Sequence, residues 1–234
     1  MQRKSDSPVM MAYEDLKERI ITFKLLPNTQ LSDHKLAQEL GVSRASVREA
    51  ILLLGMDGLV DTNDANKIVV APIGLPDVLD IMNVRCALES EAIRIIAGNG
   101  WLSAEKEKEL RQIQDAMDEH VANKNFREQY NYDDLFHRTI VEASGSPRII
   151  LFLERMRLQM QRARWLNVTM PQRQVEAVEE HEAFLKVFLN HDLEGSLHLM
   201  REHLTKSADM FKAMMTDQDM QTFILMIKNF YQYE

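Results

Sequence analysis

The chain of 234 residues contains few residues that interrupt or cross-link a fold: one cysteine, eight glycines and six prolines. The single cysteine, Cys86, excludes a disulfide framework within the chain and is typical of a reducing compartment. Glycine makes up about 3% of the residues, against an average near 7%, which is too little for the many turns of a large β fold. We therefore expect a mainly α protein.

Long apolar runs are also missing. No stretch of 18 or more apolar residues is present, so no segment is expected to cross a membrane. The first residues, Met-Gln-Arg-Lys-Ser-Asp, lack the apolar core of a signal peptide. Apolar residues make up 45% of the chain and charged residues 27%, as in a globular protein. We expect a cytoplasmic protein with no membrane partner.

The formal net charge of −8 is distributed unevenly along the chain. Residues 1–76 carry nine Lys and Arg against ten Asp and Glu, whereas residues 77–234 carry 19 against 26. The nearly neutral first part lacks the broad basic footprint of a non-specific nucleic-acid binder. It can still bind DNA if its few cations are well placed.

Residues 1–73 show the pattern of a small domain. Apolar residues spaced by three and four predict a helix over Met10–Lys24. Ser32 can cap a short helix over Asp33–Leu40, and Ser43 can cap a third helix after a tight corner. Two short β-rich pieces then flank a polar turn at residues 63–66. Three helices followed by a hairpin are the arrangement of a winged helix-turn-helix.

The stretch Leu31–Ile51, with Leu-Gly-Val-Ser-Arg and Val-Arg-Glu-Ala at its centre, closely resembles the DNA-binding motif of the GntR family of bacterial regulators. The resemblance covers about residues 10–72 and implies binding to double-stranded operator DNA. The family usually has Pro where Ser46 stands and Arg-Gly where Asn66-Lys67 stands. This wing is therefore expected to reach the minor groove differently, or less.

Arg44 and Arg48 are four residues apart and so share one side of the third helix. The fork of an arginine side chain suits bidentate contact to guanine in the major groove. The alternative is that both are solvated surface arginines. We expect them to contact DNA, together with Ser43, Ser46 and Lys67.

After a linker at residues 74–76, the chain from 77 to 216 reads as six consecutive helices with short connections. Such helices form an antiparallel bundle. An apolar tail over residues 217–234 is expected to be helical and has no assigned role.

Three of these helices carry polar residues in the middle of an apolar stripe. Asp133 and His137 lie one turn apart in one helix, His181 lies in the stripe of another, and His203 in that of a third. Buried carboxylates and imidazoles need partners, and one cation would satisfy all four. The alternative is that each histidine is an ordinary hydrogen-bonded core residue. Periodicity alone leaves both interpretations open.

Residues 77–215 resemble the FCD domain, the effector-binding domain of the FadR subfamily of GntR regulators. The marks are Arg85-x3-Glu89, Asp133-x2-Phe-His137, Ala143-Ser-Gly-Ser, Glu180-His181 and Arg201-Glu-His203-Leu. The resemblance implies that Asp133, His137, His181 and His203 ligate a metal. Six helices resemble the smaller, VanR-like branch more than the seven-helix branch. The intact ligand set argues against the metal-free, acyl-CoA-responsive mode of some members.

The resulting hypothesis is a metal-containing transcriptional repressor that binds a two-fold operator as a homodimer. It would change its DNA affinity when a small organic acid binds. The ligand types favour zinc, and nickel or manganese is compatible. Arg85 is the candidate anchor for the effector carboxylate, the alternative being a surface ion pair with Glu89.

Two other functional classes stay open at this point. A metal-dependent hydrolase would need a general base beside the metal, and no unassigned carboxylate lies in the middle of a stripe. It would also have no use for Arg44 and Arg48. A purely structural metal would require that protein groups fill every coordination position.

Overall fold

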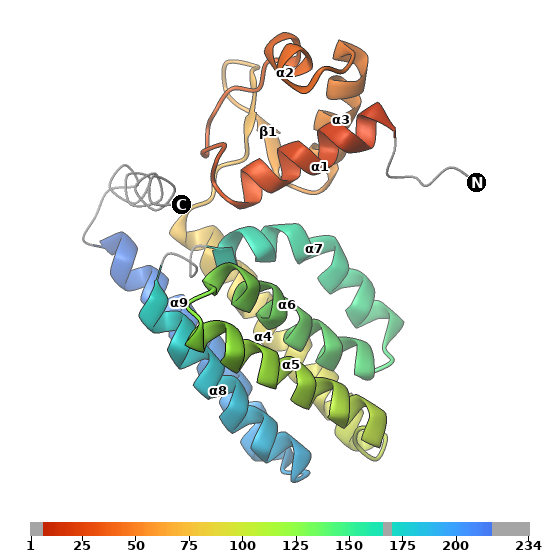
Figure 1. The fold of residues 1–234 in the computed structure, drawn as a ribbon, viewed down its shortest axis with the longest axis vertical. Coiled ribbons are helices and arrows are strands. Elements are labelled where there is room, and N and C mark those ends of the chain that lie inside the picture. The colour runs from red at the N-terminus through yellow and green to blue at the C-terminus, as the bar shows by residue number, and fades with distance from the viewer. Residues whose placement is uncertain (1–6, 166–169, 217–234) are drawn as a thin grey trace. The chain divides into compact units, whose positions relative to one another are not determined.

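The computed structural model describes residues 7–165 and 170–216, which form two compact units. The first unit comprises residues up to Gly74 together with Met156–Arg162, and the second comprises the remainder (Figure 1). Within the described ranges, no helix is both long enough and apolar enough to span a bilayer. The apolar tail over residues 217–234, which the sequence predicts to be helical, lies outside the described residues.

The first unit has three helices, α1 (Pro8–Ile21), α2 (Asp33–Leu40) and α3 (Arg44–Met56). The Ser32 side chain accepts a hydrogen bond from the backbone N–H of Lys35, and Ser43 accepts one from Ser46. Gly41 ends α2 in the left-handed conformation, with a φ of 66°, and so makes the corner before α3. Helix α3 packs against both α1 and α2.

Helix α1 ends three residues before the Lys24 that its apolar spacing suggested. The side chain of Thr22 donates a hydrogen bond to the carbonyl of Glu18, and Phe23 has a φ of 59°, which no helix can accommodate. Phe23 is nonetheless buried. Its apolar spacing therefore reflects a place in the core and not membership of the helix.

The wing is an antiparallel hairpin of β1 (Val60–Thr62) and β2 (Ile68–Val70), in which Asp61 faces Val69. The side-chain oxygen of Asn63 accepts hydrogen bonds from the backbone N–H groups of Ala65 and Lys67. These bonds hold the polar turn that the sequence indicated. The first unit is thus the expected winged helix-turn-helix.

The described part of the second unit contains six helices, as expected: α4 (Leu75–Gly98), α5 (Ala104–Ala122), α6 (Phe126–Ala143), α7 (Pro147–Trp165), α8 (Pro171–Leu189) and α9 (Leu193–Thr216). Residues 156–162 of α7 belong to the first unit. Helix α4 begins inside the stretch 74–76 that was expected to be a linker.

Five of these helices build the bundle that carries the candidate site. Helix α4 packs against α6 and α9, α5 against α6 and α8, and α8 against α6 and α9 (Figure 1). The core between them includes fully buried side chains from four helices: Ile93, Leu110, Phe136, Phe184 and Phe188. Helices α6 and α9 both pack against α8, so the three helices face a common interior, which is where the polar residues of their stripes lie.

Candidate metal centre and DNA-contacting helix

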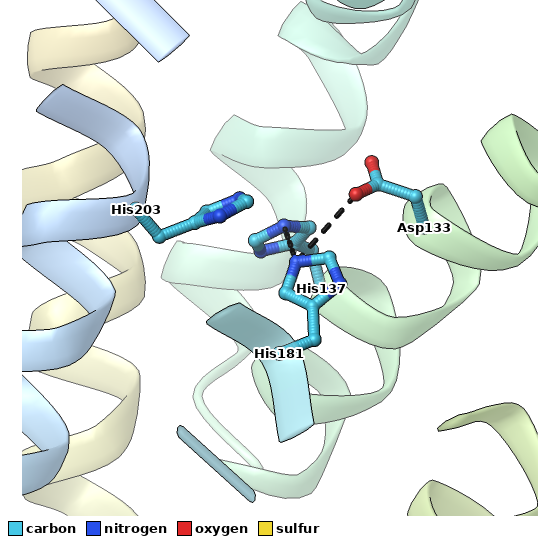
Figure 2. Close-up of side chains that lie close together, drawn as sticks. All are labelled: Asp133, His137, His181 and His203. Atoms are coloured by element: carbon cyan, nitrogen blue, oxygen red, sulfur yellow. Dashed lines mark hydrogen bonds and ion pairs between the residues drawn. The ribbon is translucent and has the colours of Figure 1, made fainter. Parts of the chain in front are cut away.

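Four side chains from three helices converge inside the second unit. Asp133 and His137 come from α6, His181 from α8 and His203 from α9, and their ligand atoms all lie within 4.8 Å of one another (Figure 2). The three histidines are buried, whereas Asp133 retains 15% side-chain exposure. The structure thus brings together the four residues that the stripes and the FCD resemblance indicated.

The imidazoles point at a common centre. The Nε2 atoms of His137 and His181 lie 3.2 Å apart, and the same atom of His181 lies 3.5 Å from Oδ1 of Asp133. Two buried nitrogens in this position cannot both carry a proton directed at the other. A shared cation at the centre accommodates all of them, because each nitrogen then offers a lone pair.

Glu89 orients the ring of His137 by binding its Nδ1, the nitrogen that does not face His181. Its Oε2 accepts a hydrogen bond from Nδ1 of His137 at 2.7 Å, while its Oε1 accepts one from Nε of Arg85 at 2.9 Å. A carboxylate can only accept, so the proton of His137 sits on Nδ1 and Nε2 presents its lone pair to the cluster. Burial raises the pKa of Glu89, but the charge of Arg85 and the contact with His137 hold that pKa well below its usual range.

Glu180 does the same for His203. Its Oε2 accepts a hydrogen bond from Nδ1 of His203 at 2.7 Å. The Arg173 guanidinium binds both oxygens of the same carboxylate, at 2.9 and 2.6 Å. Burial raises the pKa of Glu180, but the hydrogen bonds from His203 and Arg173 outweigh this effect and hold the pKa at about 2. Glu180 is therefore ionised at neutral pH and fixes the His203 tautomer.

The protonation state of His203 also suits a metal ligand. Burial lowers the pKa of His203 to about 4, even though its hydrogen bond to Glu180 acts in the opposite direction. At neutral pH the ring is uncharged, and its second nitrogen keeps a lone pair. Three imidazoles, one carboxylate and two supporting carboxylates are a donor set that a divalent cation fits.

A small cavity adjoins this cluster. It is lined by Asp133 and His203 and by Met82, Arg85, Gln129, Tyr130, Arg173, Gln174, Ala177 and Ser207, and its volume is about 20 Å³. A space of this size holds about one water molecule, so only a compact ligand enters unless side chains move. Apolar packing therefore does not cover the cluster where Asp133 and His203 line the cavity.

Arg85 is neither a surface residue nor half of a surface pair. Only 2% of its side chain is exposed, and its ion pair with Glu89 is equally buried. Its Nη1 lies 3.8 Å from the sulfur of Met82, and its Nη2 has no hydrogen-bond partner among the described residues. The pair with Glu89 therefore lies in the interior and not at the surface, and among the described residues nothing accepts a hydrogen bond from Nη2 of Arg85 beside the cavity.

The buried carboxylates were not recognised as part of the site from the sequence. Glu89 is spaced like half of an exposed i,i+4 pair, and Glu180 neighbours a histidine of the stripe without lying in it. Arg173 was also missed, although it stands eight residues, or about two helical turns, before His181. Both carboxylates hold histidines and are themselves bound by arginines, so neither is placed as a general base.

The expected DNA-contacting residues lie on the surface of the first unit. The side chains of Arg44 and Arg48 are 57% and 63% exposed. Both approach one carboxylate, with Asp33 Oδ2 lying 3.1 Å from Nη2 of Arg44 and 3.5 Å from Nη1 of Arg48. The two guanidinium groups are therefore held on one side of α3.

The remaining expected contacts lie at the start of α3 and at the wing. The hydroxyl groups of Ser43 and Ser46 lie 2.9 Å apart at the start of α3, where Ser43 also caps the helix. Lys67 is exposed at the end of the hairpin turn. All five expected contacts are thus on or near the helix and wing that a winged helix-turn-helix presents to DNA.

Each of the two units contains a match to a known family model. Residues 8–70 match the model of the bacterial regulatory proteins of the gntR family, and residues 80–206 match that of the FCD domain. The chain is 32% identical over 213 residues to the HTH-type transcriptional regulator BphR of Paraburkholderia xenovorans, covering 86% of this chain and 84% of that protein.

Two further relatives share most of their length with the chain. It is 28% identical to the gluconate operon transcriptional repressor of Bacillus subtilis, over 81% of this chain and 74% of that one. The solved structure of E. coli McbR/YncC superposes with a TM-score of 0.72 at 23% identity, covering 89% of this chain and 98% of that chain. This last similarity shows that the fold is shared.

Proposed function

The chain belongs to the gntR family of bacterial regulatory proteins and carries an FCD domain, and we propose that it is a metal-containing repressor that responds to a small carboxylate. Members of this family are DNA-binding transcriptional regulators and not enzymes, so the hydrolase alternative is set aside. The finer parts of the proposal concern the metal, the effector, the operator and the direction of regulation.

One observation carries the metal assignment. Four ligand atoms from three helices lie within 4.8 Å of one another, and carboxylates hold two of the three histidines by their Nδ1 atoms. Asp133, His137, His181 and His203 would hold a divalent ion, with zinc favoured by the nitrogen-rich set and nickel or manganese compatible. When bound, such an ion supplies positive charge and coordination positions for a carboxylate.

The cavity supports an effector site over a purely structural metal. Asp133 and His203 line it, so the proposed ion would have an open side there. Arg85 lines the same cavity, and its Nη2 has no hydrogen-bond partner in the part of the chain that the structure describes. We assign Arg85 as the group that binds and orients the effector carboxylate, because a buried guanidinium with a remaining donor is well suited to it.

DNA reading is assigned to the exposed side of α3. Arg44 and Arg48 would contact base edges in the major groove, and Ser43, Ser46 and Lys67 would contact the backbone. One such helix reads only a few base pairs, so specific binding requires a homodimer on two half-sites related by two-fold symmetry. A monomeric mass by light scattering at micromolar concentration would contradict this part.

Repression is the direction supported by the gluconate operon repressor, with which the chain shares 28% identity. In the proposed mechanism, two residues of α4 connect it to the site. Arg85 binds the effector, and Glu89 binds His137, a ligand of the metal. Helix α4 follows directly after the first unit in the chain. A ligand that prefers one arrangement of α4 relative to α6, α8 and α9 shifts the equilibrium towards it.

Metal content tests the proposal. Helix α9 offers a matched pair of variants, His203→Ala at the cluster and His198→Ala at a side chain that is 75% exposed. We expect about one zinc per chain in wild type and in His198→Ala, measured by elemental analysis after dialysis against zinc, and a strong loss in His203→Ala. A thermal-shift screen of small carboxylates should then give shifts only in the zinc-bound proteins. Equal zinc in all three proteins would refute the site.

A further inference from the structure

The cavity beside the metal cluster contains polar atoms that the fold does not satisfy. Nη2 of Arg85, Nε of Arg173 and both amide atoms of Gln129 are buried and make no hydrogen bond within the described part of the chain. All three residues line the same cavity. Leaving buried donors and acceptors unpaired costs free energy, so their collection in one place indicates a ligand that pairs with them.

Gln129 is the most informative of the three. Its side chain is fully buried, at 0% exposure, and it lies one helical turn before Asp133 on α6. Arg85 and Arg173 are tied to carboxylates, whereas neither Oε1 nor Nε2 of Gln129 has a partner among the residues described. An amide both donates and accepts, so its complement is a neutral group with the same ability, such as a hydroxyl.

The charges around the cavity limit the ligand further. Five charged side chains with at most 15% exposure surround it or hold its histidines: Arg85, Arg173, Asp133, Glu89 and Glu180. Two are positive and three negative, which leaves one negative charge. A divalent cation would change this to one positive charge, and a single carboxylate would neutralise it. A second carboxylate would leave a buried excess negative charge, which is costly.

We infer that the effector is a compact hydroxy acid with one carboxylate, and that Gln129 determines this specificity by hydrogen bonding to the hydroxyl group. Because the cavity of about 20 Å³ holds only about one water molecule, the lining side chains must move apart when such an acid binds. The inference rests on the proposed function, in which Arg85 takes the carboxylate. It adds a residue that selects among small carboxylates. Gln129 acts on the ligand directly and is not assigned a role in holding the metal.

Gln129→Met tests the unsatisfied amide without the ligand. Methionine has a similar length and no polar amide, so the zinc-loaded full chain should melt at the same or a higher temperature than wild type. Gln114→Met is the matched control, because Gln114 is equally buried but donates to the carbonyl of Val178 at 3.2 Å. We expect Gln114→Met to lower the melting temperature. A lower melting temperature in Gln129→Met would show that the amide is already satisfied, contrary to the inference.

Calorimetric titration of the zinc-loaded full chain tests the ligand class. The probes are propionate, lactate, 3-hydroxypropionate and malonate. We expect wild type to bind one of the hydroxy acids roughly tenfold more tightly than propionate, the size of one good neutral hydrogen bond. In Gln129→Met this preference should disappear, while propionate affinity stays within about twofold. Malonate should bind more weakly than the preferred hydroxy acid.

The outcomes separate the inference from the function on which it rests. If the preference for the hydroxy acid persists in Gln129→Met, another group reads the hydroxyl and Gln129 is not the specificity residue. If malonate binds most tightly, the charge argument is wrong. If none of the four acids binds the zinc-loaded wild type, the carboxylate effector of the proposed function fails, and the inference fails with it.

Discussion

Two pairs of arginines, one pair in each unit, occupy opposite surroundings. Arg44 and Arg48 on α3 are more than half exposed and share one partly exposed aspartate, whereas Arg85 and Arg173 are at most 5% exposed and each binds a buried or nearly buried carboxylate. Exposed ion pairs contribute about 0–1 kcal/mol, but breaking a buried pair costs about 3–5 kcal/mol. Arg44 and Arg48 are thus available to a partner, whereas Arg85 and Arg173 form part of the interior of the second unit.

The same contrast applies to the histidines of α9. His198 is exposed beside Glu202, and His203 is buried with its ring held by Glu180. An exposed side chain can be removed with little effect, whereas a buried one leaves its partners unsatisfied. Substitutions should therefore affect binding to DNA in the first unit and stability together with metal content in the second.

The largest effect is expected at Glu89. Glu89→Gln removes the charge that Arg85 needs in the core and the acceptor that orients His137, so unfolding in urea should show a loss of about 3–5 kcal/mol. Zinc affinity should fall by about 10–100-fold, because the ligand loses its supporting hydrogen bond. Glu91→Gln is the control on the same helix, since Glu91 pairs with Arg94 at the surface. A similar loss in both variants would remove the contrast between buried and exposed pairs.

A smaller effect is expected for Arg48. Arg48→Ala should weaken specific operator binding by about 1–3 kcal/mol if the side chain contacts a base edge, with the melting temperature unchanged. The measurement is fluorescence anisotropy at fixed salt, on a duplex that the wild-type protein selects from a randomised pool. Lys17→Ala, on α1, should have little effect. Unchanged affinity of Arg48→Ala would show that α3 is not the recognition helix.

The smallest effect is expected at the wing. Lys67→Ala should weaken binding about equally on selected and unrelated duplexes, because a lysine on a phosphate carries no sequence information. The slope of log affinity against log salt should decrease in magnitude by about one. If discrimination between the two duplexes changes instead, Lys67 reads sequence and the wing contributes more than its departure from the family pattern suggests.

Local features of the sequence predicted much of the fold. The capping serines Ser32 and Ser43 and the polar turn at Asn63 each act within a few residues, so the winged helix could be anticipated. The apolar period misplaced the end of α1, because Phe23 reaches the core from a residue that is not helical. Periodicity reports which side is buried and does not report the backbone conformation at a helix end.

The metal candidates were predictable from the local pattern together with the resemblance to the FCD domain. Asp133 and His137 interrupt one apolar stripe at helical spacing, and such interruptions are visible without a structure. Glu89 and Glu180 were missed, since their roles depend on which helices face each other, and that is set by packing between distant segments. Gln129 lies four residues before Asp133, which itself lies four residues before His137. Following this row of polar residues one turn further towards the start of α6 leads to Gln129.

Metal-dependent coupling of the two units is the central claim. The most direct test is a titration of DNA binding in wild type and His203→Ala with the small carboxylate that wild type binds most tightly. With zinc present, this acid should change the affinity of wild type for its selected duplex by about 5–150-fold, the usual range of allosteric coupling. The variant, shown by elemental analysis to be metal-free, should bind the same duplex without the acid as wild type does, and the acid should have no effect on it. A metal-free variant that responds to the acid as wild type does would contradict the claim and leave the ion with a structural role only.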